Sequence, residues 1–258
     1  MREIAKIIKN NLRIDGRKLL EYRNIEYKQG VIETAEGSAW VRAGNMEVLA
    51  GVKISIMEPY PDTPDEGALM VDTQLLPLSN PHFTGGPPDN ATIEVARVID
   101  RGLREGEAVD RKKLVIKEGE KVWAVSIDVI PLNYDGNLID IGGIAAMLAL
   151  MNTRLPELID GKINYKKLTD KRLPIKHIPI PITVYKINGN YFVDPTDEEE
   201  RVAEVRLTVT VLENGKICAL QKGGYGTLTM KDIEEITAIA IEKSKELREK
   251  IFKTIGGE

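Results

Sequence analysis

Strand-like segments lead into helices twice along this chain, and this order limits the class of fold. In the first half, apolar runs bounded by turn residues predict strands at residues 30–35, 37–43, 46–56, 68–76 and 121–132 and helices at residues 3–12, 90–107 and 141–154. In the second half, strands at residues 182–187, 191–193, 203–212 and 217–221 precede a helix at residues 229–252. The order predicts an α+β fold of two similar β-rich halves with packed helices.

The same patterns give the expected limits of the two halves. Residues 1–154 form the first half, which contains an arginine-rich helix, and residues 181–258 form the second half with its C-terminal helix. Residues 155–180 are expected to be a connector with one short helical turn. The helix at 141–154 is rich in Ala, Met and Leu on nearly all sides, which predicts that it is buried.

Composition describes an ordinary globular protein: of 258 residues, 42% are hydrophobic and 29% are charged. No apolar run approaches the roughly 20 residues that a bilayer span requires, so no membrane contact is expected. Cys218 is the only cysteine, which excludes an internal disulfide, agrees with a cytoplasmic location and, in its apolar run, predicts a core residue. The net charge of −4 argues against nucleic-acid binding over the whole surface, although a local basic stripe remains compatible with it.

The helix at 90–107 combines an apolar stripe with a basic one. Asn90 is the expected N-cap. Residues four positions apart form the inner stripe, namely Val95, Ile99 and Leu103. A nearly opposite stripe consists of Arg97, Arg101 and Arg104. Guanidinium groups on one face suit phosphates. The pattern alone favours the simpler interpretation of a solvated face, paired in part with Glu94, Asp100 or Glu105.

Other chemistry finds little support in the residues. His82 and His177 lie in loops without a local partner, no Gly-x-Ser-x-Gly or phosphate-binding motif occurs, and Gly223–Gly226 is expected to be a turn. An acidic cluster could bind Mg²⁺ or Mn²⁺ but is more simply solvated: Asp194, Asp197, Glu198, Glu199 and Glu200. Asp135 is expected to form a turn. The lysines at 112, 113 and 117 are interpreted as a solvated patch. We therefore expect no cofactor and no metal site.

Several pieces of the chain, in this order and spacing, are similar to the RNase PH family. They are Asp15-Gly16-Arg17, Val48–Val52, Glu94–Arg101, Asp128–Ile130 and Asp135-Gly136. The resemblance covers the chain from about residue 15 to the final helix. Further pieces resemble the family's non-catalytic archaeal exosome subunits: Pro77-Leu78, Gly86–Asp89 and Tyr134–Asn137.

The resemblance also shows where the family's chemistry is lost. Active members are phosphorolytic 3′→5′ exonucleases that hold phosphate with an arginine and use two aspartates six residues apart. Matching Asp135-Gly136 to the family puts Ile139 at the arginine position, and an alkyl group cannot donate to phosphate. Matching Ala203-Glu204-Val205 puts Glu200 and Arg206 at the aspartate positions, and Arg206 can neither accept a proton nor bind a cation. The resemblance therefore implies no catalytic residue in this chain.

The resemblance implies a non-catalytic subunit in a hexameric ring with a catalytic sister subunit, acting in phosphorolytic RNA decay. Single-stranded RNA is the expected ligand, and RNA-binding cap proteins could join the ring. In such subunits Arg97 and Arg101 match positions that hold the RNA backbone near the sister's active site; the role of Arg104 stays open. Two alternatives remain: an active phosphate-dependent exoribonuclease, with Glu200 and its acidic neighbours holding a metal, and a pure scaffold that makes no RNA contact.

Overall fold

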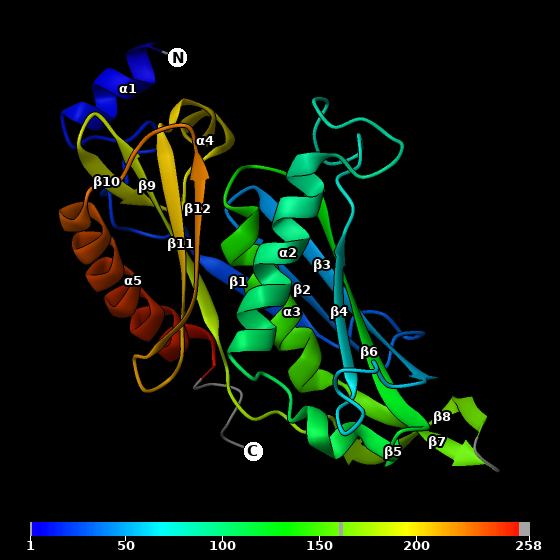
Figure 1. Cartoon of the computed structure of the whole chain (residues 1–258). Helices are drawn as coiled ribbons and strands as arrows, with labels where there is room; N and C mark the ends of the chain where they lie inside the picture. Colours follow the sequence, from blue (N-terminus) through cyan, green and yellow to red (C-terminus); the bar gives the residue numbers. More distant parts are fainter. Residues whose placement is uncertain (1, 160–161, 253–258) are drawn as a thin grey trace.

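The computed structural model describes residues 2–159 and 162–252, which form two large β-sheets with helices packed against them and one two-stranded sheet (Figure 1). The first sheet has the strand order β1-β2-β3-β6-β4, and β5 pairs with β6. Only β4 runs parallel to its neighbour β6; the other pairs are antiparallel. Its strands are β1 Ile25–Gln29, β2 Gly37–Ala43, β3 Met46–Met57, β4 Ala68–Thr73, β5 Val115–Lys117 and β6 Lys121–Asn133.

The second sheet is antiparallel throughout and has the order β10-β9-β11-β12. Its strands are β9 Ile180–Ile187, β10 Asn190–Val193, β11 Val205–Val211 and β12 Ile217–Gly224. The helices of the described chain are α1 Arg2–Lys9, α2 Asn90–Glu105, α3 Leu138–Asn152, α4 Asp197–Val202 and α5 Met230–Ile251, with a 3₁₀ turn, η1, at Arg111–Leu114. The expected α+β class is confirmed, while the limits proposed for the two halves stay a prediction.

Helix α3 is the centre of the core. It contacts β2 and β3 of the first sheet and β9 of the second, and every residue from Leu138 to Leu150 is buried. The prediction of a helix buried on nearly all sides is thus confirmed. Helix α5 packs on β9 and β11 (Figure 1), and its inner stripe consists of Ile236, Ala240, Leu247 and Ile251. None of the described helices is long and apolar enough to cross a membrane.

Three local predictions are wrong. Residues 30–35 are not a strand: Gly30 has a φ of +69° and the backbone turns there, so the first strand is β1, which ends at Gln29. The described residues of the connector form no helical turn but a hairpin of β7 (Arg154–Ile159) and β8 (Lys162–Arg172). Its strands are fixed by polar contacts that a search for apolar periodicity cannot detect. An example is the hydroxyl of Thr169, which donates to the Leu155 carbonyl at 2.7 Å.

The third correction concerns the start of α2. The N-cap is Asp89 rather than Asn90, because a carboxylate oxygen of Asp89 accepts from the backbone N–H of Thr92 at 2.8 Å and from its hydroxyl at 2.6 Å. Asn90 is the first residue of the helix. The two contacts of Asp89 lower its pKa, since they stabilise the carboxylate.

Candidate nucleic-acid interface

Helix α2 lies between the two large sheets and packs against α3 (Figure 1). Arg97 and Arg101 are on its exposed side. Ile99 and Leu103 are buried as predicted, whereas Val95 is only partly buried. The inner face is close-packed: a Cβ added at Gly142 of α3 would lie 3.1 Å from Ile99, and one at Gly102 would lie 3.0 Å from Thr210 of β11. The helix is therefore packed against both halves, and this packing fixes the backbone positions from which its outward side chains extend.

Arg97 and Arg101 are exposed and form no hydrogen bond or ion pair with any described residue. Both line an open groove of about 510 Å³ along α2, which Gln221 of β12 borders on the other side. Two unpaired guanidinium groups one helical turn apart leave ten N–H donors directed at solvent or a ligand. This geometry suits successive phosphates of a single strand.

Arg104 lines the same groove but is already occupied. Its guanidinium donates to both oxygens of Asp100, at 2.9 and 3.2 Å, and to the backbone carbonyl of Leu69 on β4 at 2.6 Å. The hydrogen bond to Asp100 is the main reason that the pKa of Arg104 is raised. Of the three arginines, only this one has the intramolecular partner that the solvated-face interpretation expected.

The positions that match the family's catalytic residues are filled by other contacts. Ile139 is 4% exposed and packs in the first turn of α3. Arg206 forms an ion pair with Glu94 of α2 at 2.9 Å, which joins the second sheet to the arginine helix. Glu200 accepts hydrogen bonds from the hydroxyl groups of Tyr134 at 2.7 Å and Tyr185 at 2.6 Å.

The two phenols beside Glu200 are donors that do not ionise near neutral pH. Burial, with the nearby charge of Glu200, raises the pKa of Tyr134 and Tyr185 well above the usual value of a phenol. Burial alone would lower the pKa of Arg206, but Tyr185, Glu94 and Glu200 together raise it. Glu200 and Arg206 therefore belong to one network of hydrogen bonds and charges.

The acidic cluster is mostly structural, so its interpretation as a solvated loop is wrong for two members. Asp194 and Glu199 are both 0% exposed. The carboxylate of Asp194 accepts from Arg17 at 2.8 Å and from Arg23 at 2.7 Å, and Glu199 pairs with the buried Arg13. No group of three or more metal-ligating side chains occurs among the described residues.

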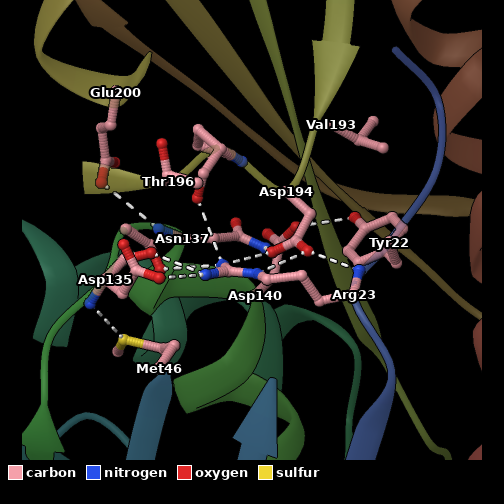
Figure 2. Close-up of polar contacts among 12 residues, drawn as sticks. Tyr22, Arg23, Met46, Asp135, Asn137, Asp140, Val193, Asp194, Thr196 and Glu200 are labelled. Carbon is pink, nitrogen blue, oxygen red and sulfur yellow. Dashed lines mark hydrogen bonds and ion pairs between the residues drawn. The ribbon is translucent and has the colours of Figure 1, made fainter. Parts of the chain in front are cut away.

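Arg23 is the bridge between the halves in this network (Figure 2). It donates to Asp194 of the second half and, at 2.8 Å, to the carbonyl of Asp135 in the first half. Asn137 adds a bond of 2.9 Å to the same Asp194 carboxylate. Asp135 and Gly136 form the expected turn, with a φ of +75° at Gly136. The turn therefore also fixes where the second half docks.

We predict that Gly136→Ala lowers the free energy of unfolding by about 2–4 kcal/mol, because strain at positive φ adds to overpacking. A Cβ at this position would lie 2.5 Å from the carbonyl oxygen of Pro195. Gly119→Ala is the matched control, since Gly119 has a φ of +70° but no neighbour within 4 Å. Urea unfolding of both variants separates the two effects. Equal losses would show that the close approach to Pro195 contributes nothing.

The three lysines lie on the surface as predicted, whereas Cys218 is not the core residue that the sequence predicted. The lysines at 112, 113 and 117 each pair with a nearby carboxylate: Asp65, Asp110 and Glu120, respectively. Cys218 is partly buried, and burial raises the pKa of its thiol to about 11, which leaves it protonated and unreactive. His177 lies 3.5 Å from Glu213, a partner that is distant in sequence.

Comparisons with known proteins define the class. Residues 21–156 match domain 1 of the 3′ exoribonuclease family, and residues 177–243 match domain 2. The chain belongs to this family, the RNase PH family, as the sequence motifs predicted.

Its relatives include archaeal proteins of nearly the same length. The chain is 45% identical to the exosome complex component Rrp42 of Thermococcus kodakarensis, over 98% of this chain and 94% of that protein. It is 46% identical to the Rrp42 component of Archaeoglobus fulgidus, over 96% and 93%. A chain from the Archaeoglobus fulgidus exosome with RNA bound to the active site superposes with a TM-score of 0.90, at 44% identity and 96% coverage of each chain. A chain of an archaeal exosome core gives 0.86, at 41% identity, with 96% of this chain and 94% of that chain covered.

Proposed function

We propose that this chain is the non-catalytic RNase PH-like subunit of an archaeal exosome, which completes a hexameric ring with a catalytic sister subunit. Similarity to Rrp42 components over almost the whole chain supports the assignment to the complex. The observation that supports the non-catalytic role concerns two residues that match catalytic positions of the family, Ile139 and Arg206. Ile139 is buried, and Arg206 is paired with Glu94.

The second part of the proposal is that Arg97 and Arg101 bind the backbone of single-stranded RNA near the sister's active site. Both guanidinium groups are exposed and unpaired within the described chain, on a helix that is anchored to both halves. Contacts with phosphates position a strand without reading its sequence, which suits an enzyme that degrades RNA of any sequence. Arg104 is not assigned a direct contact in this proposal, since Asp100 and the Leu69 carbonyl already occupy it.

The test is an RNA-shortening assay on this chain alone and after mixing with the catalytic sister, each with and without inorganic phosphate. We expect no shortening by the chain alone, because neither Ile139 nor Arg206 can perform the chemistry of the family's residues. The mixture should shorten RNA only when phosphate is present. Phosphate-dependent shortening by the chain alone would show that it is an active exoribonuclease. The activity must follow the amount of this chain through every purification step, so that a contaminating nuclease is excluded.

A further inference from the structure

Arg97 has two carboxylates within reach on its own helix. Glu94 precedes it by three positions and Asp100 follows it by three, a spacing at which side chains on a helix surface meet and form ion pairs. In the structure neither carboxylate pairs with Arg97. Glu94 is held by Arg206 at 2.9 Å, and Asp100 is held by Arg104 at 2.9 Å. Two other arginines thus occupy the acids that would otherwise neutralise Arg97.

The packing around Arg206 holds its guanidinium in position for the ion pair with Glu94. Arg206 is on β11, its side chain is 21% exposed, and its guanidinium rests against Gly223 of β12, where a Cβ would lie 2.5 Å from the guanidinium carbon. Its charge is also stabilised by the nearby carboxylate of Glu200. Because Arg206 belongs to the second sheet, the pair draws Glu94 of α2 toward that sheet.

We propose that Arg206 is a positioning residue for RNA binding: by pairing with Glu94, it keeps that carboxylate off Arg97 and leaves the Arg97 guanidinium free for an RNA phosphate. The inference rests on the proposed function of Arg97. It assigns a role to an arginine that stands where the active members of the family have an aspartate. Arg104 pairs with Asp100 and keeps this second carboxylate off Arg97. This role explains why Arg104 is paired while Arg97 and Arg101 are not.

The experiment measures binding of a single-stranded oligoadenylate RNA to the assembled complex of this chain and its sister. Arg206→Gln keeps most of the side-chain volume but removes the charge that pairs with Glu94. Since an exposed ion pair on a helix is worth a few tenths of a kcal/mol to about one, the Kd should rise about two- to fivefold. The dependence of log Kd on log salt concentration should fall by up to about 0.7, the amount expected for one phosphate contact with a single strand.

Two further variants identify the cause. Glu94→Gln in the Arg206→Gln background should restore the wild-type Kd, and Glu94→Gln alone should leave it unchanged or lower it. Arg201→Gln is the charge-matched control: it removes one positive charge from an exposed pair with Asp197 at 2.7 Å and should change the Kd less than Arg206→Gln does.

The inference is overturned if Arg206→Gln binds as the wild type does, or if the added Glu94→Gln fails to restore binding. An Arg201→Gln effect as large as that of Arg206→Gln would reduce the result to general charge and would also overturn it. Weaker binding by Glu94→Gln alone would also overturn the inference. This test remains valid even if replacing Arg206 disturbs the fold, because the variant keeps Arg206. Failure of the underlying function is recognised separately, because charge reversal at Arg97 and Arg101 would then have no effect either.

Discussion

Replacing both Arg97 and Arg101 with glutamate should raise the Kd of the assembled complex for single-stranded RNA about 100-fold or more, because hydrogen bonds to charged groups contribute about 1.5–3 kcal/mol each. Both side chains are exposed and unpaired within the described chain, so their loss removes no internal contact. Phosphate-dependent shortening of RNA at concentrations below the wild-type Kd should fall in proportion. Filter binding and gel-based decay assays measure the two effects.

The matched control is a Lys112→Glu and Lys113→Glu double variant, which makes the same change in net charge elsewhere on the first half. These lysines pair with Asp65 and Asp110, and their side chains are 70% and 71% exposed. We expect this control to shift the Kd only slightly. Size-exclusion chromatography must show intact complexes for both variants, so that a lost ring is not mistaken for lost binding.

Unchanged RNA decay by an intact ring that carries the Arg97 and Arg101 reversals would support the pure scaffold alternative. The salt dependence provides an independent criterion. Two lost contacts with a single strand should lower the slope of log Kd against log salt by about 1.4. An unchanged slope would mean that neither guanidinium contacts a phosphate, whatever happens to the rate of decay.

Much of the fold could be predicted from the sequence, because its elements carry strong local patterns. The alternation of β6 and the uniformly apolar character of α3 follow directly from burial, and both elements lie where they were expected. The hairpin of β7 and β8 escaped prediction because polar contacts across its strands hold it together. The first strand was misplaced since the chain turns at Gly30 and the real strand, β1, precedes it.

The pairing of the charged residues could not be predicted, because it depends on contacts between residues far apart in the chain. The two arginine partners of Asp194 are separated from it by 177 and 171 positions, and Arg206 lies 112 positions beyond Glu94. From sequence, Asp194 belonged to an acidic run and Glu94 to a helix face. Only the folded chain shows that Asp194 is fully buried and that Glu94 pairs with Arg206 instead of Arg97. The stripe of arginines was visible, but which of them remain unpaired was not.

The buried carboxylate of Asp194 should be the most sensitive single position for stability. Asp194→Asn should lower the free energy of unfolding by about 3–5 kcal/mol, because it removes the buried carboxylate that two guanidinium groups share and leaves them only the more exposed Asp15 and Asp135. Arg17 and Arg23 would both lose this partner, and their side chains are only 11% and 8% exposed. Asparagine tolerates the positive φ of 48° at this position, so the loss comes from the carboxylate, whose charge and one acceptor oxygen are both removed. Asp197→Asn, which affects an exposed pair, should cost less than about 1 kcal/mol.

The pH dependence of the same variant gives a second criterion. Burial alone would raise the pKa of Asp194, but its bonds to Arg23 and the charges of Arg23 and Arg17 lower it below the usual 3.8. A carboxylate with a lowered pKa stabilises the fold above its unfolded pKa, and this contribution is lost as the pH falls through the folded value. The difference in unfolding free energy between wild type and Asp194→Asn should therefore shrink below about pH 4. A separate change is expected near pH 7, because the charge of Asp194 adds to the burial that raises the pKa of Asp140 to about 7, and Asp194→Asn removes that charge. A difference that stayed constant into acid would show that the Asp194 carboxylate is not the group that holds the arginines.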